Sequence, residues 1–515
     1  MRPPVASRGL ARPQRLARAA ASPANAAATP SSRSPASCAT GRRHASSSSR
    51  LSAWTSALPA ASGSRTAPIP TAAGQSVRVA DPLKLLSSEL SFLRQNITSL
   101  LGSKHPALDT IAKYYFRAEG KHVRPMIVLL MSQATNGLSP RWTEVQQREM
   151  DREQQRREGK GMGVDEPLEQ EEVLMDENPS MLERAKDLLR NPMAAFSSSP
   201  SSSPSTDAST FASSSANLLP TQRRLAEITE LIHVASLLHD DVIDLAATRR
   251  SAPSAPSLFG NKLSILAGDF LLARASLALS RLGSNEVVEL VASVLANLVE
   301  GEVMQMKGNV PSAAANGAGS AAGKDSARST IVSASSLSGR GPTPEIFEHY
   351  MRKTYLKTAS LIAKSARATT ILGGAGSRQG WVEGEAVKDI AYEYGRNLGI
   401  AFQLIDDMLD FTASAAELGK PGGGADLKLG LATAPALYAW DEFPELGELI
   451  ERKFDREGDV ERAKHLILRS SGAERTFALA EEHSNAAIEA LRRLPESDAR
   501  DALEKIARDV LTRTK

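Results

Sequence analysis

The sequence predicts an all-α protein, and three observations support this fold class. Long apolar runs with helical periodicity recur from Thr221 to the C-terminus. No stretch shows a convincing alternation of apolar and polar residues, as a half-buried strand would. Two of the helical runs carry the same acidic pattern, Asp240-Asp241-Val-Ile-Asp244 and Asp406-Asp407-Met-Leu-Asp410. Helices of this length and apolar content can bury one large core.

Residues 1–80 differ in composition from the rest of the chain. They contain no Asp or Glu, and arginine recurs among abundant Ser and Ala. This composition is typical of an organelle transit peptide, and it predicts import into the mitochondrial matrix with cleavage before Asp81. A disordered basic tail without a targeting role is the alternative. The single cysteine, Cys38, lies in this segment, so neither a disulfide framework nor a thiolate metal site is expected.

The charge balance and hydropathy narrow the range of partners. The formal net charge is +3 in 515 residues, so no general attraction to nucleic acid is expected. No continuous apolar run reaches the roughly 18 residues that a spanning helix needs. The sequence therefore predicts a protein that is soluble or associates peripherally with the inner membrane.

Folded sequence is expected from Asp81 onward. Asp81-Pro82 is typical of a helix N-cap followed by proline at the first helical position, and a second helix is predicted from Pro106 to Arg117. The segment Gly120-Lys121-His122-Val123-Arg124-Pro125 then runs into an apolar helix. Two cations at a helix start can bind an anion together with the free backbone N–H groups.

Two segments interrupt the helical pattern. Residues 137–219 are strongly charged and then Ser-rich, and residues 311–342 are rich in Ala, Ser and Gly. Neither composition can bury a core, so both are expected to be disordered insertions in a single domain that spans residues 81–515. Further helices are predicted at 261–283, 286–307, 344–372, 384–411 and, in several pieces, from about 432 to 514.

The two acidic patterns predict a metal site. Asp240 and Asp244 are one helical turn apart, so their carboxylates project from the same face and repel each other. Mg²⁺ would relieve that repulsion, since it takes oxygen ligands, commonly one or two carboxylates with water and substrate phosphate. For one such pattern alone, a solvated acidic helix face is the alternative. Two helices facing each other would place carboxylates on opposite walls of one cavity, which favours a metal–diphosphate site.

Several further motifs accompany the acidic patterns and together resemble one family. They are Gly120–Pro125, Glu230-Leu-Ile-His233, Thr248-Arg249-Arg250, Phe259-Gly-Asn-Lys262, Leu266-Ala-Gly-Asp269, Lys357-Thr358, Phe402-Gln403, Gly419-Lys420-Pro421 and Asp426-Leu-Lys428. From about Asp81 to the C-terminus, outside the two insertions, the chain resembles the trans-isoprenyl diphosphate synthases. It is most similar to the mitochondrial polyprenyl diphosphate synthases that make the ubiquinone side chain. The sequence departs from the usual pattern of this family at Ala246-Ala247 and at Ser251-Ala252-Pro253, but none of these residues is assigned a role in the site.

The resemblance implies a fold, a reaction and partners. The fold would be the isoprenoid synthase fold, an antiparallel helical bundle around a deep central cavity, assembled as a homodimer or as a heteromer with a related subunit. The reaction would be the sequential 1′-4 condensation of isopentenyl diphosphate onto an allylic diphosphate of the farnesyl or geranylgeranyl type. Two to three Mg²⁺ ions would occupy each site, and the product would be a long all-trans-polyprenyl diphosphate.

The resemblance also assigns roles to residues. The metal ligands would be Asp240, Asp244 and Asp406, with Asp241 and Asp407 also in the catalytic set and Asp410 completing the second motif. The allylic diphosphate would be contacted by Arg249 and Lys357, both catalytic, and by Thr358, Gln403 and Lys420. Isopentenyl diphosphate would be contacted by Lys121, Arg124, His233 and Arg250. His233 lies on the apolar face of its helix, where a satisfied core histidine is the alternative.

These residue types suit the chemistry. Breaking the C1–O bond of an allylic diphosphate produces a carbocation and a polyanionic leaving group, which Mg²⁺, lysine and arginine stabilise. No protein nucleophile is required. Two rival interpretations remain open: a non-catalytic regulatory subunit, which would have lost charged site residues, and a class I terpene cyclase, which would lack the second Asp-rich motif.

Product length is predicted from two small residues. Ala235 and Ser236 lie about one turn before Asp240, where short-chain members of the family place an aromatic residue. Since nothing bulky blocks the growing chain at that depth, the resemblance implies a product of about C30 to C50. The alternative is that both residues are small only for helix packing and that a deeper residue ends growth.

Overall fold

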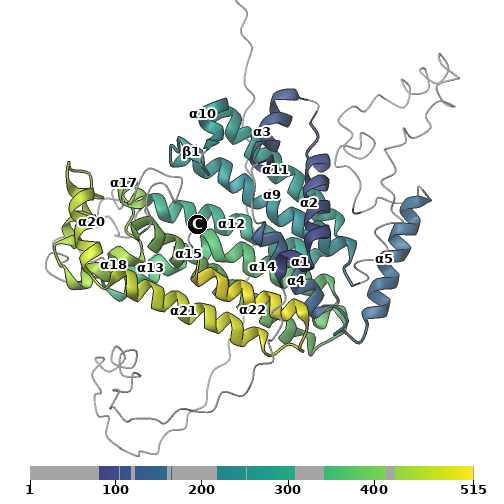
Figure 1. Cartoon of the computed structure of the whole chain (residues 1–515). Coiled ribbons are helices and arrows are strands. Elements are labelled where there is room, and N and C mark those ends of the chain that lie inside the picture. The colour runs from purple at the N-terminus through teal and green to yellow at the C-terminus, as the bar shows by residue number, and fades with distance from the viewer. Residues whose placement is uncertain are drawn as a thin grey trace, which may run out of the picture. The chain divides into compact units, whose positions relative to one another are not determined.

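Helices dominate the computed structural model, which describes residues 81–103, 105–117, 122–158, 164, 217–250, 252–307, 341–412 and 424–513 (Figure 1). These residues belong to one unit, Ser76–Lys515. The only strands among them are β1 (Thr248–Arg249) and β2 (Ala252–Pro253), an antiparallel pair that the sequence does not predict. The predicted all-α class is confirmed.

The N-terminal helices begin where the sequence predicts. The Asp81 side chain accepts a hydrogen bond from Leu83 N at 3.2 Å and caps α1 (Pro82–Leu85). The chain then turns at Leu86, which is fully buried and anchors the turn in the core. The next helices are α2 (Ser87–Leu100), α3 (Pro106–Arg117) and α4 (Val123–Thr135).

The core is built around α9 (Pro220–Ile243). This helix packs against α4, α11 (Asn261–Arg281) and α14 (Ser360–Leu372), and α15 (Gly384–Thr412) packs in turn against α14. The apolar residues of α9 are buried at helical spacing, at Leu225, Ile228, Leu231, Ile232, Ala235 and Leu238. Because several faces of α9 are covered, the residues at its C-terminal end are held in place from more than one direction.

The remaining helices complete the bundle, with α21 (Gly472–Leu491) and α22 (Asp498–Leu511) packed against α15. They are α10 (Ala255–Phe259), α12 (Asn285–Lys307), α13 (Pro344–Thr354), α17 (Ala425–Lys428), α18 (Ala434–Glu442), α19 (Leu446–Glu451) and α20 (Asp459–Arg469), with the 3₁₀ turn η4 (Ser377–Gln379). The ranges predicted at 261–283, 286–307 and 384–411 differ from α11, α12 and α15 by at most two residues at either end.

The predicted helix 344–372 contains one irregular turn. It begins as α13, continues as the π-helical turn η3 (Tyr355–Ala359) and ends as α14. Helix α15 approaches η3 closely because residue 399 is glycine: a Cβ there would lie 2.5 Å from Ala359 Cα. Single π-helical turns inside helices are frequent at functional sites, and this one carries Lys357.

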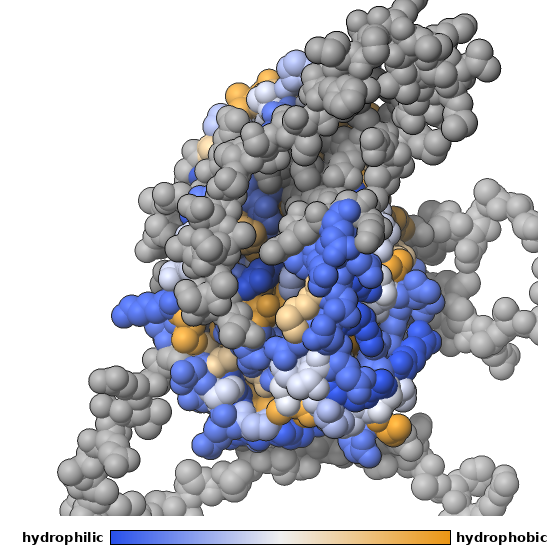
Figure 2. Space-filling view, turned by 90° about the vertical axis from the view of Figure 1, so that its right-hand side faces the viewer, coloured by the Kyte–Doolittle hydropathy of each residue, from blue (hydrophilic) through white to orange (hydrophobic). Residues whose placement is uncertain are grey.

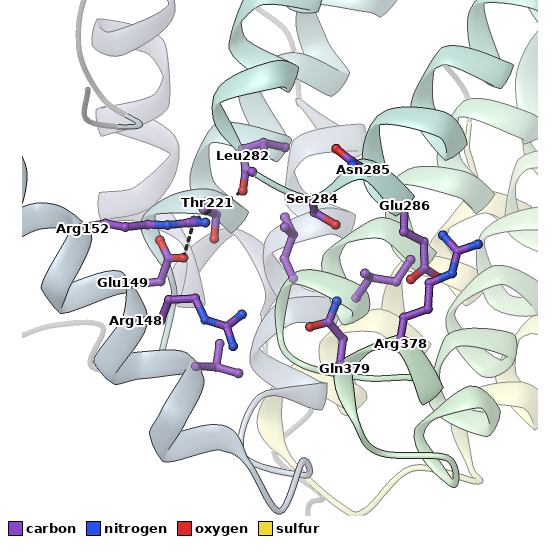
Figure 3. A pocket seen from close by; sticks show the side chains of 14 residues that line it. Arg148, Glu149, Arg152, Thr221, Leu282, Ser284, Asn285, Glu286, Arg378 and Gln379 are labelled. Carbon is purple, nitrogen blue, oxygen red and sulfur yellow. Dashed lines mark hydrogen bonds and ion pairs between the residues drawn. The ribbon is translucent and has the colours of Figure 1, made fainter. Parts of the chain in front are cut away.

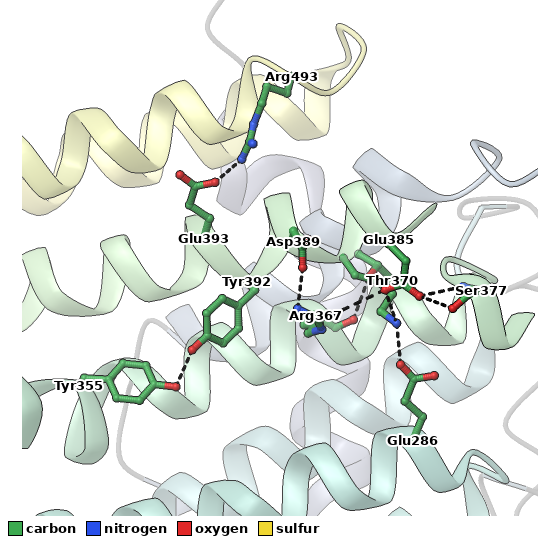
Figure 4. Close-up of polar contacts among 11 residues, drawn as sticks. Glu286, Tyr355, Arg367, Thr370, Ser377, Glu385, Asp389, Tyr392, Glu393 and Arg493 are labelled. Atoms are coloured by element: carbon green, nitrogen blue, oxygen red, sulfur yellow. Dashed lines mark hydrogen bonds and ion pairs between the residues drawn. The ribbon is translucent and has the colours of Figure 1, made fainter. Parts of the chain in front are cut away.

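Ion pairs and hydrogen bonds join α12, α14 and α15 outside the apolar core (Figure 4). Arg367 Nη1 on α14 lies 2.8 Å from Asp389 Oδ1 on α15. Glu286, at the start of α12, accepts from Lys388 Nζ on α15 at 2.6 Å. The buried Lys388 also pairs with Glu385, and this contact lowers the pKa of Glu385 to about 2. The starts of α12 and α15 are thereby joined.

Residues 137–219 do not form one disordered insertion, contrary to the sequence prediction. Helix α5 (Trp142–Arg157) lies within this range, and it contacts the core through the buried Val145 and through Arg152, which donates to the carbonyl of Leu282 at 3.4 Å. The prediction is wrong for residues 142–157. A composition poor in apolar residues shows that a segment cannot form a core of its own, but Glu, Gln and Arg still favour a helix on the surface. Figure 2 views the side on which α5 lies in Figure 1, and the coloured surface there is mainly hydrophilic.

Several predictions fall outside the described residues. The predicted transit peptide, residues 1–80, is one of them, as are residues 165–216 and 308–340, which make up most of the two predicted insertions. Among the described helices, α11 alone is long and apolar enough to span a bilayer, with 39% of its apolar window buried within the protein. The sequence analysis found no continuous apolar run of that length, and α11 is not one, because Asp269 and Arg274 interrupt it.

Candidate active site

The first acidic motif lies at the C-terminal end of α9. The amide of Asp244 donates to the carbonyl of Asp240 at 2.8 Å and ends the helix, so both side chains project from the last turn. The pKa of Asp240 is raised to about 6, mainly by burial and to a lesser extent by the neighbouring Glu302 and Asp244, while Lys357 opposes the shift. Burial also raises the pKa of Asp244. These two carboxylates are therefore costly to ionise without a cation.

Asp241 has a different environment from its two neighbours in the motif. It is fully buried and accepts from Arg249 Nε at 2.9 Å, from Arg249 Nη2 at 2.5 Å and from the Tyr115 hydroxyl. A bidentate pair of this kind fixes the guanidinium plane. Asp241 therefore holds Arg249, on β1, beside the motif, and the sequence analysis had not singled out Tyr115.

Lys357 approaches the first motif from η3. Its Nζ lies 2.5 Å from Oε2 of Glu302 on α12, and the two side chains are mostly buried. Glu302 is a site residue that the sequence analysis missed. In the sequence Glu302 is one of two glutamates that flank Gly301, and no spacing rule connects it to Lys357.

The second acidic motif lies near the end of α15, and its first aspartate has a basic partner. Asp406 Oδ1 lies 2.5 Å from Arg513 Nη1, a residue close to the C-terminus that the sequence analysis did not assign. The Arg513 guanidinium also lies 4.1 Å from the centroid of the Phe402 ring. Asp406 is the most exposed carboxylate of its motif, whereas Asp407 and Asp410 are buried.

Asp407 belongs to a chain of buried hydrogen bonds. It accepts from the Tyr350 hydroxyl at 2.6 Å and from Gln403 Nε2 at 2.8 Å, while Gln403 Oε1 accepts from the Thr358 hydroxyl at 2.7 Å. Burial raises the pKa of Asp407, and Lys353 opposes this shift. The chain connects the second motif to Thr358, directly after Lys357.

Asp410 supports the backbone that follows α15. Its two carboxylate oxygens accept from the amides of Ala425 and Asp426, each at 3.1 Å, at the start of α17. Both donors are helix N-terminal amides without an intrahelical partner. Asp410 therefore has a structural role, whereas Asp406 is the most exposed carboxylate of this motif.

The oxygen ligands fit a hard divalent cation. Asp240, Asp244 and Asp406 offer carboxylate oxygens, and the adjacent His239 lies 3.4 Å from Asp269 instead. Mg²⁺ is commonly held by one or two carboxylates with water and substrate phosphates. Within the described ranges no group of three or more acidic or histidine side chains forms a ready-made metal cage. The raised pKa of Asp240 is the observation that favours a cation here.

A pocket of about 280 Å³ lies beside Arg249, and none of the aspartates of the two acidic motifs lines it. Its lining includes Tyr114, His122, Glu230, His233 and Arg250. Arg124 Nη1 lies 3.0 Å from His233 Nε2. Because a guanidinium only donates, His233 Nε2 carries no proton. Burial and the nearby Arg124 and Arg250 hold the pKa of His233 well below its usual range. Arg124, His233 and Arg250 are thus brought together as predicted.

Two further residues support this pocket. His122, the N-cap of α4 with φ 42°, accepts from Arg94 Nε at 3.1 Å through Nε2, so its Nδ1 donates to Glu230 Oε1 at 3.1 Å. Both residues lie within motifs that the sequence analysis quoted, but neither had a role there. The predicted contacts Lys121 and Lys420 lie outside the described residues.

The predicted chain-length positions lie in the C-terminal half of α9. Ala235 is fully buried, and the half-buried Ser236 donates to the carbonyl of His233 at 2.8 Å. Near them, α11 approaches α9 at Gly268, where a Cβ would lie 2.2 Å from His239 Nε2. The close approach of α11 therefore depends on this glycine.

A separate cavity of about 340 Å³ lies between α5, the α11–α12 turn and η4 (Figure 3). Arg148, Arg152 and Gln379 line it, and Arg152 is bonded to Glu149 at 2.9 Å. None of the predicted site residues lines this cavity.

Comparison with known proteins agrees with this geometry. The family described as polyprenyl synthetase matches residues 205–467. The probable mitochondrial hexaprenyl pyrophosphate synthase of Neurospora crassa is 48% identical, with 84% of this chain and 82% of that protein covered. The mitochondrial hexaprenyl pyrophosphate synthase of Saccharomyces cerevisiae is 43% identical, with 84% and 91% covered.

A solved structure gives the same fold. The polyprenyl synthase from Caulobacter crescentus, which was crystallised with calcium and isoprenyl diphosphate, superposes with a TM-score of 0.57 at 24% identity and covers 87% of this chain and 100% of its own. The predicted isoprenoid synthase fold and mitochondrial location are confirmed. The rival interpretations, a regulatory subunit and a terpene cyclase, are not favoured. The chain belongs to the polyprenyl synthetase family and is a prenyltransferase.

Proposed function

We propose that this protein is a long-chain all-trans-polyprenyl diphosphate synthase that supplies the ubiquinone side chain. It would add isopentenyl diphosphate units to a farnesyl or geranylgeranyl type allylic diphosphate. The observation that supports this most directly is the proximity of two anion sites. Arg249 is held by Asp241 next to the first acidic motif, and the same Arg249 lines the pocket that contains His233 and Arg250.

Asp240, Asp244 and Asp406 would hold the Mg²⁺ ions, which supply charge neutralisation for the leaving diphosphate when bound. Lys357 and Arg249 would stabilise the negative charge that develops on the same group as the C1–O bond breaks. Thr358 and Gln403, which are bonded to each other, would support this side of the site together with Lys420. No protein nucleophile takes part.

Arg124, Arg250, His233 and Lys121 would bind the diphosphate of isopentenyl diphosphate. His233 suits this role as an acceptor from Arg124, because it keeps the guanidinium oriented while remaining neutral. The double bond of isopentenyl diphosphate attacks the allylic carbocation, and the proton lost in forming the new double bond passes to the departing diphosphate. These steps leave the protein chemically unchanged.

Exposed apolar residues favour assembly into a homodimer. Leu263, Ile265 and Leu266 on α11 are 38%, 42% and 56% exposed, and Val299 and Met306 on α12 are 65% and 54% exposed. An extended apolar surface on two adjacent helices is typical of an interface. One relative, from Schizosaccharomyces pombe, is named decaprenyl-diphosphate synthase subunit 1, so a heteromer is the alternative.

Incubation of the purified protein with Mg²⁺, farnesyl diphosphate and isopentenyl diphosphate, followed by chromatographic sizing of the dephosphorylated product, tests the function. Relatives from Neurospora crassa, Yarrowia lipolytica and Saccharomyces cerevisiae are named hexaprenyl synthases, which favours a C30 product. A cyclic product or no turnover would contradict the proposal.

The chain-length proposal has its own test. Ala235→Phe and Ser236→Phe should each shorten the product to one to three added units, because a ring at that depth blocks the growing chain. The half-buried Ser236 is the safer position for folding, since Ala235 is fully buried. A wild-type product that stops at C15 or C20 would rule out this assignment before any variant is made.

A further inference from the structure

Among the described residues, Glu302 forms its ion pair with Lys357. The ion pair spans 2.5 Å, and the side chains of Lys357 and Glu302 are 19% and 12% exposed. Apart from this pair, neither carboxylate oxygen of Glu302 has a hydrogen-bond partner among the described residues. Buried carboxylates normally accept several hydrogen bonds. The Lys357 ammonium is therefore the contact that accounts for the position of Glu302.

The backbone around Lys357 is tightly confined. A Cβ on Gly301 would lie 2.8 Å from Lys357 Cγ and 3.0 Å from Lys357 N. On the α15 side, a Cβ on Gly399 would lie 2.5 Å from Ala359 Cα. The π-helical turn is thus packed between two glycines, and Glu302 follows directly after one of them. The position of the Lys357 side chain then depends on its charged partners.

Three carboxylates compete for this one ammonium. Lys357 interacts with Asp240 and Asp244 as well as with Glu302. If Lys357 paired with Asp240 or Asp244, it would occupy the oxygens that a divalent cation needs. The ion pair that Lys357 forms is instead with Glu302, at 2.5 Å.

We propose that Glu302 is a positioning residue that keeps Lys357 beside Asp240 and Asp244 and leaves both carboxylates available to the metal. This inference rests on the proposed function, because it assumes that the first motif binds Mg²⁺. The Lys357 ammonium would then already lie where negative charge develops on the leaving diphosphate. The side chain would not need to move during the reaction.

Metal binding to the full-length protein, measured with Mn²⁺ by electron paramagnetic resonance in the absence of substrate, tests the inference. Glu302→Gln keeps the shape and removes the charge, so Lys357 should move onto Asp240 and Asp244. The dissociation constant for Mn²⁺ should rise about 10-fold or more. Glu300→Gln, an exposed position on the same helix, is the matched control and should leave binding unchanged.

The same measurement in a Lys357→Met background separates positioning from direct ligation. If Glu302 acts through Lys357, adding Glu302→Gln to Lys357→Met should not weaken Mn²⁺ binding further. Equal weakening in both backgrounds would show that Glu302 is itself a metal ligand and would overturn the inference. Unchanged Mn²⁺ binding in Glu302→Gln alone would also overturn it.

A pair of variants that keep both charges tests whether misfolding explains a loss of Mn²⁺ binding. Glu302→Asp withdraws the carboxylate by one methylene, and the longer side chain of Lys357→Arg should recover part of the lost Mn²⁺ affinity in the double variant. If the single and double variants are both folded, as checked by circular dichroism, and the double variant recovers no Mn²⁺ affinity, the result would contradict the positioning role of Glu302. Metal binding needs no turnover, so failure of the proposed function would appear separately, as a wild-type protein that binds Mn²⁺ and makes no polyprenyl product.

Discussion

The two acidic motifs have the same spacing, but their side chains have different partners. In the first motif the middle residue, Asp241, is neutralised by Arg249, and Asp240 and Asp244 remain together with raised pKa values. In the second motif both Asp407 and Asp410 have structural partners. We therefore expect the first motif to offer two carboxylates to a cation and the second to offer one, Asp406.

The difference follows from where each helix ends. Helix α9 ends at Ile243, so Asp244 lies at the helix terminus beside Asp240. Helix α15 continues to Thr412, so Asp410 is still helical and reaches the amides of the following segment instead. Two motifs with the same spacing can therefore differ in how many carboxylates are available to bind a metal, depending on where the helix ends relative to the third aspartate.

The largest expected effect tests which carboxylates carry the metal. Asp240→Ala and Asp406→Ala should each lower kcat/KM by about 10³-fold or more, because the charge on the leaving diphosphate loses its counterion. Steady-state assays with farnesyl and isopentenyl diphosphates measure this, and circular dichroism checks the fold. Near wild-type activity in Asp406→Ala would contradict the expected difference between the motifs, since the second motif would then contribute no metal ligand.

A smaller effect is expected from a change at Asp241, the middle residue of the first motif. Asp241→Ala leaves the mostly buried Arg249 without its bidentate partner, so the free energy of unfolding should fall by about 3 kcal/mol. The KM for the allylic diphosphate should rise in parallel with Arg249→Ala. Urea unfolding and kinetics measure these effects. A variant of normal stability with unchanged KM would show that Arg249 is held by other contacts.

Asp410→Ala should act on stability alone. Its carboxylate caps the amides of Ala425 and Asp426, and loss of a cap costs about 1 kcal/mol. Urea unfolding should detect this loss, while the Mg²⁺ concentration for half-maximal activity should stay at the wild-type value. A marked increase in the Mg²⁺ requirement would place Asp410 among the metal ligands and remove the difference between the motifs.

The pH dependence of the metal-free protein should show the smallest effect. The pKa of Asp240 is about 6 in the folded state against 3.8 ordinarily, so between these pH values the unfolded chain loses its proton first. Stability should therefore fall as pH rises from about 4 to 6, by an amount on the order of 1 kcal/mol. Asp240→Asn should remove this contribution in urea unfolding at pH 5 and 7. An unchanged slope would contradict the raised pKa.

Much of the fold was predictable because helical periodicity and capping are local properties. The Asp81 cap and the ends of α11, α12 and α15 follow from residues within a few positions of each other. Helix α5 was missed because its composition is that of a solvated segment, although one buried residue, Val145, and contacts to Leu282 attach it to the core.

The sequence by itself determined the fold class, the positions of the two acidic motifs and the family, since each depends on residue types at short spacing. Only the tertiary structure decided which carboxylates remain open to a cation. That choice depends on partners far away in the sequence: Tyr115 for Asp241 and Tyr350 for Asp407. The pairing of Glu302 with Lys357 is of the same kind. Burial and charge compensation are properties of the packed bundle, and they exist only once helices from different parts of the chain meet.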